Sequence, residues 1–363
     1  MAAAGVIIVW SILYIFYLPD GNLRVTFCDV GQGDGIYIDL PDGKDVLIDG
    51  GPGRAVLECI GERMPFWDRK IEVVDLTHPQ ADHLGGLVEV LRRYEVGVFV
   101  SGPIGNETKG YKELVEAVRE RNVQVKNVYA GDDIKMKITN RRNQIVNKFQ
   151  IPNFKLQTRS KLSIINYQLP KEISFRILWP SRKYIAGNVT GKSLQNQTHV
   201  RPKLKREKYG LQERAEGEIL QNDTYVREEL KRENVLGLST EHSDLNDFSL
   251  VLEVKFGEFE VLLTGDADEE IQDEIMAASD VDSVEIFKVP HHGSKYGILD
   301  EFLEKSKPVF AVVSVGKNRW GHPSPEVIRR LGDRRIRVLR TDRNGDVTIV
   351  SNGKQYWVES DRK

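Results

Sequence analysis

The sequence predicts an α/β fold whose strands end in loops that carry polar residues. Short apolar runs rich in β-branched side chains are followed by glycine, aspartate or histidine, as expected for buried strands that end at turns. The stretch 87–94 instead places Leu87, Val90, Leu91 and Tyr94 on one face of a helix. Five of the seven histidines lie in three short motifs, a distribution that scattered core histidines would not produce.

Charge is distributed unevenly along the 363 residues, although the net charge is only -2. Between positions 141 and 210 there are sixteen Lys or Arg residues and two acids, so the rest of the chain is acidic. This length and an apolar content of 40% predict one large domain with additions. The basic stretch indicates either a polyanionic partner or a solvated insertion, and both interpretations remain open.

Residues 2–18 contain no charged side chain and are almost wholly apolar. As a helix they would extend roughly 26 Å, which nearly spans the hydrocarbon core of a bilayer. The residues that follow do not form the usual cleavage site of a signal peptide, so we predict an uncleaved membrane anchor over residues 1–20. The alternative is a buried helix of the domain.

The first two strands are expected at 23–30 and 36–38, on either side of a glycine-rich turn that contains Asp34. A third strand, 45–48, ends in Asp49 and two glycines. Both aspartates could accept hydrogen bonds from metal-bound imidazoles. Asp and Gly are also common in ordinary turns, so neither turn is strong evidence alone.

The strand predicted at 71–77 leads directly to the most informative motif in the chain. Two imidazoles, an amide and a carboxylate occur within six residues, at His78, Gln80, Asp82 and His83. These are metal-ligating side chains, and the following Gly85-Gly86 leads into the helix at 87–94. The motif therefore lies on a strand-to-helix turn.

Two later strand ends carry similar residues. A hairpin of 249–254 and 260–263 leads to Asp266, and a strand at 286–290 leads to His291 and His292. The two cysteines, Cys28 in a predicted strand and Cys59 in a predicted helix, are expected in the core. A bridge between them is compatible with an extracytoplasmic domain, but spacing alone does not establish it.

Together these motifs resemble the metallo-β-lactamase fold superfamily and, within it, the hydrolase domain of DNA-internalisation competence proteins of the ComEC type. The resemblance covers about 23–138 and 173–357. It implies an αββα sandwich over residues 21–363, with metal at one edge of the sheets and insertions at about 139–172 and 181–243. The motifs that carry it are 29–34, 49–51, 78–83, 85–86, Asn246 with Ser249, 265–267, 291–294 and 322–323.

The resemblance also implies a set of metal ligands. His78 and Gln80 would serve one ion, Asp82 and His83 a second, and Asp266 would bridge them. His291 is expected to complete a coordination shell, and His292 to contact substrate. We therefore expect one or two divalent ions, manganese, magnesium or zinc, with the amide oxygen of Gln80 favouring manganese or magnesium. The alternative for Gln80 is a site that has lost activity.

The reaction implied is hydrolysis of a phosphodiester, with DNA as the substrate. Asp82 would orient the attacking water and His322 would face the phosphate. Further candidates for supporting or substrate contacts are Ser294, Ser314 and Asn318. The alternatives are hydrolysis of another ester, thioester, lactam or small phosphodiester, or a catalytically weakened DNA-binding relative.

The basic stretch interleaves cations with aromatic residues, a mixture typical of nucleic-acid binding. Its candidate contacts are Arg141, Arg142, Lys148, Arg159, Lys203, Lys205 and Arg206. The stretch 181–243 has low hydrophobicity and is expected to be a flexible insertion with a short helix near 225–231. A role in DNA uptake would require a separate pore, since the chain has at most one membrane-spanning segment.

Overall fold

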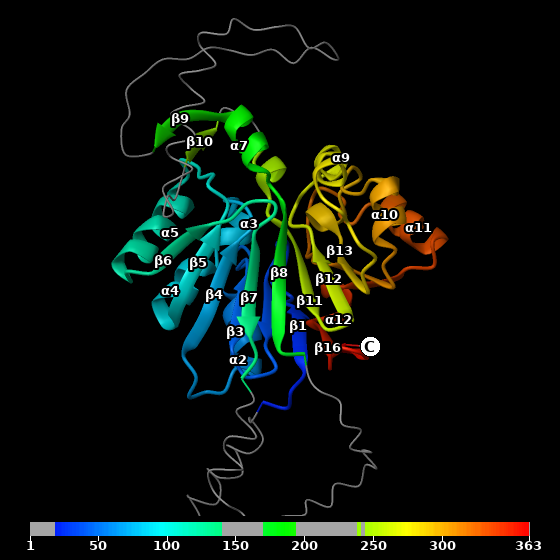
Figure 1. Ribbon diagram of the computed structural model, residues 1–363, viewed down its shortest axis with the longest axis horizontal. Coiled ribbons are helices and arrows are strands. Elements are labelled where there is room, and N and C mark those ends of the chain that lie inside the picture. The colour runs from blue at the N-terminus through cyan, green and yellow to red at the C-terminus, as the bar shows by residue number, and fades with distance from the viewer. Residues whose placement is uncertain (1–18, 140–169, 194–237, 241–243, 363) are drawn as a thin grey trace, which may run out of the picture.

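Two β-sheets packed face to face form the centre of the protein, and helices cover their outer surfaces (Figure 1). The computed structural model describes residues 19–139, 170–193, 238–240 and 244–362. The first sheet contains, in spatial order, β17 (Tyr356–Ser360), β16 (Val347–Ser351), β1 (Leu23–Phe27), β2 (Ile36–Asp39), β3 (Asp45–Ile48), β4 (Lys70–Leu76), β5 (Glu95–Ser101) and β6 (Gln124–Asn127).

The second sheet is built mostly from the C-terminal half. Its spatial order is β15 (Arg337–Arg340), β14 (Phe310–Val313), β13 (Ile286–Lys288), β12 (Phe259–Leu263), β11 (Val251–Phe256), β8 (Glu172–Trp179) and β7 (Asp133–Lys137). In each sheet one part is parallel, β3 to β6 and β12 to β15, and the rest is antiparallel. Parallel neighbours end at the same sheet edge, which brings their following loops together.

Helices flank both sheets. On the first sheet these are α2 (Ala55–Arg63), α3 (Ala81–Leu84), α4 (Leu87–Arg93) and α5 (Lys109–Glu120), and on the second α9 (Glu269–Ala278), α10 (Asp300–Ser306) and α11 (Pro325–Asp333). Shorter elements are α7 (Arg182–Asn188), α12 (Thr341–Asn344), the 3₁₀ turns η1 (Asn246–Phe248) and η2 (Pro290–Gly293), and the strand pair β9 (Val189–Ser193) and β10 (Leu238–Thr240).

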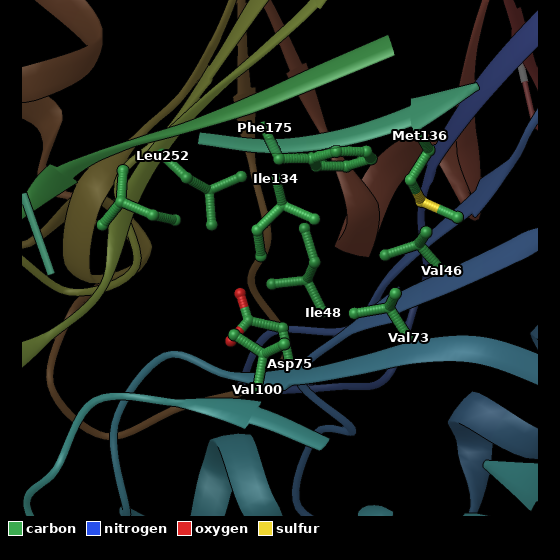
Figure 2. Close-up of a pocket in the computed structure, with 10 residues that line it drawn as sticks. Val46, Ile48, Val73, Asp75, Val100, Ile134, Met136, Phe175 and Leu252 are labelled. Atoms are coloured by element: carbon green, nitrogen blue, oxygen red, sulfur yellow. The ribbon is translucent and has the colours of Figure 1, made fainter. Parts of the chain in front are cut away.

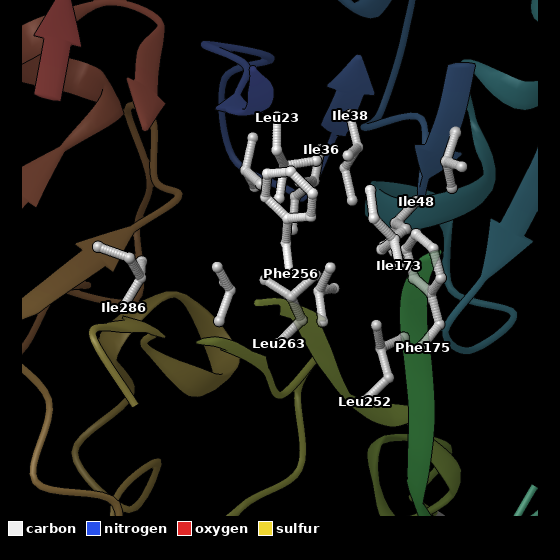
Figure 3. Close-up of a cluster of buried hydrophobic side chains, with 14 of the residues drawn as sticks. Leu23, Ile36, Ile38, Ile48, Ile173, Phe175, Leu252, Phe256, Leu263 and Ile286 are labelled. Atoms are coloured by element: carbon white, nitrogen blue, oxygen red, sulfur yellow. The ribbon is translucent and has the colours of Figure 1, made fainter. Parts of the chain in front are cut away.

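Three apolar layers hold the sandwich together. The central layer joins the facing surfaces of the two sheets, with Ile36 and Ile38 on one side and Phe256 and Leu263 on the other (Figure 3). The two outer layers pack the helices against the sheets. This arrangement confirms the predicted αββα fold, and every strand named in the sequence analysis is present within a few residues of its expected bounds.

One acidic side chain, Asp75 at the end of β4, lies inside the central layer. It faces an apolar pocket between the sheets, lined by Ile48 and Val73 on one side and Ile134 and Phe175 on the other (Figure 2). Burial, followed by the nearby Asp49 carboxylate, raises the pKa of Asp75 well above its usual value. Both effects favour the protonated, uncharged form of Asp75, the form that is less costly to bury in an apolar layer.

Residues 1–18, which include the predicted anchor, lie outside the described residues. Within the described ranges, no helix combines the length and the apolar character that crossing a bilayer requires. The predicted helix near 225–231 and most of the two predicted insertions also lie outside these ranges. The described part of the second insertion contains α7 and the β9–β10 pair.

Cys28 and Cys59 form a disulfide bond, which resolves the alternative that the sequence left open. The bond joins the residue after β1 to α2, and the two Cα atoms are 5.9 Å apart. Both side chains are buried, in the apolar layer between the first sheet and its helices. The turn after β1, which carries Asp34, is thereby tied to the helix beside it.

The disulfide should contribute measurably to stability, because it closes a sequence separation of 31 residues. Replacing both cysteines (Cys28→Ser with Cys59→Ser) should lower the free energy of unfolding by roughly 3–4 kcal/mol through the entropy of the unfolded chain. Urea titration followed by circular dichroism would measure the loss. Dithiothreitol should destabilise the wild type and leave the double variant unchanged. Equal unfolding midpoints for wild type and variant would contradict the prediction.

Candidate metal centre

The histidine motif is held where β4 ends and α3 begins, at the edge where the loops of both sheets meet. Leu76 ends the strand, and α3 carries Asp82 and His83 in its single turn. The backbone of the Gly31–Gly35 turn packs directly on this helix, and the Asp34 amide donates to the Asp82 carbonyl at 3.2 Å. At Gly33, with φ +147, a Cβ would lie 2.2 Å from that same carbonyl oxygen. Only glycine permits this close approach.

Four side chains from three separate loops converge at this edge, and we call them the inner cluster. One ligand atom from each lies within 4.8 Å of the others, and the members are Asp82, His83, Asp266 and His292. The Nε2 atoms of His83 and His292 are each 3.4 Å from Oδ2 of Asp266. Nε2 of His292 is also 3.5 Å from Oδ2 of Asp82.

The inner cluster fits a cation. The Nε2 atoms of both histidines are buried and have no hydrogen-bond partner among the described residues. A buried polar atom without a partner is costly, so such atoms require a function. Two imidazole nitrogens and two carboxylates form a ligand set typical of a divalent transition metal.

In both histidines of the inner cluster, a contact to the Nδ1 atom fixes the orientation of the ring. Nδ1 of His83 lies 2.7 Å from Oδ2 of Asp49, which also accepts from the Thr77 hydroxyl at 2.7 Å. Nδ1 of His292 lies 2.9 Å from the Ser314 carbonyl oxygen, so it must be the protonated nitrogen. Each contact leaves the Nε2 lone pair for the cluster, as is usual for metal-binding histidines. Asp49 and the main chain of Ser314 thus position the two imidazoles.

A buried lysine, which the sequence analysis did not single out, lies beside the inner cluster. Lys288 ends β13, is fully buried, and forms an ion pair with Asp34. Its ammonium group also donates to the Gly265 carbonyl at 2.6 Å and lies 3.5 Å from Oδ1 of Asp266. Burial lowers the pKa of Lys288, but Asp34 and Asp266 outweigh it and raise the pKa above its usual value. The lysine is therefore charged, and its only sequence signal was a cation inside an apolar strand.

The carboxylates give the cluster a strongly negative field. Burial lowers the pKa of His83, yet Asp266 and Asp49 outweigh burial and raise it well above its usual value. For Asp266, burial raises the pKa, and the surrounding His292, His83 and Lys288 lower it well below normal. A field that favours a proton on His83 also favours a metal ion in its place.

The other two residues of the motif lie in different surroundings. Nδ1 of His78 is 3.1 Å from both the Ser249 and Thr77 hydroxyls, and its Nε2 atom is buried without a partner. Burial, and then the neighbouring His83, lower the pKa of His78 well below normal, so it is neutral. The Gln80 amide nitrogen donates to Oδ1 of Asn246 at 2.6 Å. The contact described for the Gln80 side chain is therefore with Asn246.

The structure separates the two adjacent histidines differently from the sequence expectation. His292 lies in the inner cluster, whereas His291 lies outside it, is partly exposed, and pairs with Asp268 at 3.1 Å. The reason is local backbone geometry, because His291 and His292 have φ of 47° and 54°, and this tight turn sends their side chains in different directions. Burial lowers the pKa of His291, but Asp268 and then Asp266 raise it to about 9.

The remaining candidates surround the mouth. The rings of His322 and His291 are 5.7 Å apart, and Asn318 holds the backbone around His322. Ser294 is buried, and its amide donates to the His291 carbonyl. The Ser314 hydroxyl is buried without a partner among the described residues. The candidate nucleic-acid contacts lie outside the described residues, and they are Arg141, Arg142, Lys148, Arg159, Lys203, Lys205 and Arg206.

Comparison with known proteins finds relatives for this chain, although no protein-family model matches it. It is 25% identical over 359 residues to ComE operon protein 3 of Bacillus subtilis, which covers 93% of this chain and 34% of that protein. It is 34% identical over 105 residues to Recombination protein 2 of Haemophilus influenzae, which covers 29% of this chain and 13% of that protein. The chain thus spans at most about a third of these curated relatives.

Solved structures with a similar arrangement are metallo-hydrolases and proteins of the metallo-β-lactamase fold. YhfI from Bacillus subtilis, a metallo-beta-lactamase fold protein, has a TM-score of 0.41 and 8% identity, covering 87% of this chain and 95% of that one. Igni18, a metallo hydrolase from Ignicoccus hospitalis, has a TM-score of 0.40 and 12% identity, covering 90% and 98%.

The buried ion pair of Lys288 should matter for stability. Lys288→Met would leave Asp34 and Asp266 buried without their cation, and should lower the free energy of unfolding by roughly 3–5 kcal/mol. Adding Asp34→Asn should recover part of this loss, since one buried charge is then removed. Urea unfolding in a chelator measures both. As a control, Lys255→Met alters a half-exposed lysine paired with Glu260 and should cost less than about 1 kcal/mol. Equal losses for the two lysines would contradict the prediction.

Proposed function

We propose that this chain is a metal-dependent hydrolase that cleaves the phosphodiester bonds of DNA. The observation that carries the proposal is the inner cluster, in which two oriented imidazoles and two carboxylates converge from separate loops. The partnerless Nε2 atoms of His83 and His292 support it, because a cation bound between them would satisfy both at once. The proposal takes His292, rather than His291, as a ligand.

We further propose that the site holds one ion. A second ion would need ligands near His78, where the side chains of Gln80 and Asn246 lie instead. These two amides already bind each other, since Gln80 donates to Asn246. Amide oxygens are neutral and bind cations less strongly than imidazole or carboxylate at such positions. His291 lies 3.5 Å from the amide nitrogen of Asn246, but its Nδ1 atom already pairs with Asp268. A single ion, manganese before magnesium or zinc, suits the mixed nitrogen and oxygen ligands of the inner cluster.

The side chains have separate roles in the proposed reaction. A divalent ion supplies a Lewis acid and makes water acidic enough to act as a nucleophile near neutral pH. Asp82, whose side chain is 32% exposed, is the one cluster member open to solvent, so it can orient that water. His291 and His322 lie at the mouth, where their imidazoles can contact the phosphate oxygens. Lys288, which is itself paired with Asp34, holds Asp266 in position through the contact with Oδ1.

DNA is the proposed substrate because several independent features agree with it. The two relatives are by name a ComE operon protein and a recombination protein. The basic stretch 141–210 supplies the charge that a polyanion needs. We also propose that residues 2–18 anchor the domain outside the cytoplasm, which the Cys28–Cys59 bond supports, because disulfides persist in oxidising compartments.

Metal binding would test the ligand assignment directly. Native mass spectrometry and calorimetry with Mn²⁺ should show one ion per chain. His292→Ala should weaken binding by at least about 100-fold, since it removes a ligand rather than a supporting contact. His291→Ala should bind Mn²⁺ nearly as the wild type does. Two ions per chain, or a loss confined to His291→Ala, would show the assignment to be wrong.

Hydrolysis would test the activity itself. The purified protein should cleave DNA with Mn²⁺, and both a chelator and Asp266→Ala should abolish cleavage. Asp266→Asn, which keeps the side-chain shape, should be as inactive. Asp333→Asn serves as a control, because this exposed residue pairs only with Arg329 on the surface of α11. Hydrolysis of bis(4-nitrophenyl) phosphate without cleavage of DNA would reject the nuclease and keep the hydrolase. No hydrolysis with any divalent ion would reject both.

A further inference from the structure

An exposed tryptophan stands at the mouth of the candidate site. Trp320, in the loop between β14 and α11, is 66% exposed, the highest value among the large apolar side chains that the structure describes. Tryptophan is normally well buried, and exposing so much of an indole to water is unfavourable. A flat, exposed aromatic ring beside a reaction site is typical of a surface that stacks against a ligand.

A continuous row of rings leads from this tryptophan into the inner cluster. The Trp320 ring lies nearly parallel to that of His322, with centroids 6.4 Å apart and an interplanar angle of 15°. His322 is 5.7 Å from His291, and His291 is 6.2 Å from His292. Trp320 is therefore three ring-to-ring steps from a proposed metal ligand. A base stacked on Trp320 would belong to a nucleotide near the one that carries the reacting phosphate.

The loop that carries Trp320 is held in one shape. Oδ1 of Asn318 accepts from the amides of Trp320 and His322, at 3.1 and 3.0 Å. The amide nitrogen of Asn318 donates to the carbonyls of Gly316 and His322, at 2.9 and 2.8 Å. Four hydrogen bonds from one side chain thus fix the tryptophan relative to His322. An ordered platform loses little entropy when a ligand binds.

The same loop is also fastened to both halves of the site. A Cβ at Gly316 would lie 2.4 Å from the main chain of Gly31, so the loop packs directly on the glycine-rich turn. The Ser324 amide, at the other end of the loop, donates to the Gly293 carbonyl at 2.8 Å. This bond ties the loop to η2, the turn that carries His291 and His292, which we call the histidine turn. The position of Trp320 is consequently set by the elements that also place Asp34 and His292.

Cations flank the tryptophan. Lys317 and Arg319 are exposed on the same loop, and neither has an ion-pair partner within the described ranges. Lys295 is exposed on the neighbouring loop that follows the histidine turn. Positive side chains beside an exposed aromatic ring suit a ligand with alternating phosphates and flat bases.

We propose that Trp320 is a stacking platform for an unpaired nucleobase, and that the site accepts single-stranded nucleic acid with the scissile phosphate in front of the inner cluster. This rests on the proposed function. A base inside a duplex is already stacked on both faces, so the indole can receive only an unpaired or terminal base. Every base has a flat face that can stack, so the platform does not distinguish one base type from another. It distinguishes single-stranded from double-stranded nucleic acid instead.

The test compares ligands with and without bases. Fluorescence anisotropy in a chelator would measure binding of a short single-stranded oligodeoxynucleotide and of a base-free oligomer with the same sugar-phosphate backbone. Trp320→Ala should raise the Kd for the oligodeoxynucleotide about tenfold, the loss expected for one stacked base. It should leave the Kd for the base-free oligomer unchanged, because that oligomer has no base to stack on the indole. Trp320→Phe, which keeps a ring, should recover most of the binding.

Controls and further arms separate the outcomes. Trp357→Ala removes another exposed tryptophan, on the edge strand β17, and should bind as the wild type does. A single-stranded RNA of the same sequence shows which sugar is preferred, and dependence on Trp320 in either strand supports the platform. Equal Kd values for wild type and Trp320→Ala, with DNA still cleaved, would overturn this inference alone. A wild type that neither binds nor cleaves DNA would overturn the nuclease proposal together with it.

Discussion

The ion pair between Lys288 and Asp34 is the constraint on which the candidate site depends, because it joins the two sheets where the ligands meet. Asp34 belongs to the turn between β1 and β2 of the first sheet, whereas Lys288 ends β13 of the second. The same ammonium group lies near Asp266, which follows β12. Buried charges are tolerated only when paired, so this contact requires the two loops to stay together. The inner cluster exists only in that arrangement.

Charge balance explains why the site selects a cation. Asp34, Asp49, Asp82 and Asp266 lie close together, and Lys288 is the one permanent cation among them. The excess negative charge is what raises the pKa of His83 despite its complete burial. In contrast, His78 faces hydroxyl groups and has a lowered pKa. The energy that holds these charges together comes from the apolar layers, since the sheets would not otherwise bring like charges so close.

The sequence predicted the fold and the region of the site, because both depend on local patterns. Strand ends bearing Asp or His could be read from periodicity and turn residues. The choice between His291 and His292 could not, since it depends on two successive left-handed backbone conformations. Lys288 lay within an apolar run where periodicity indicates only a strand. The Cys28–Cys59 bond required knowledge of which helix packs beside β1. Each gap concerns contacts between segments far apart in the chain.

In the proposed reaction, the inner histidines, His83 and His292, would bind the cation, and the outer ones would contact the ligand. Each inner histidine has its Nδ1 occupied by Asp49 or a carbonyl oxygen, which leaves one lone pair and no freedom to reorient. The outer histidines, His291 and His322, are partly exposed and lie between the cluster and Trp320. Polarity therefore changes stepwise from a buried anionic pocket to an exposed indole. The proposed nucleic-acid ligand, with its phosphates and flat bases, would require surfaces in that order.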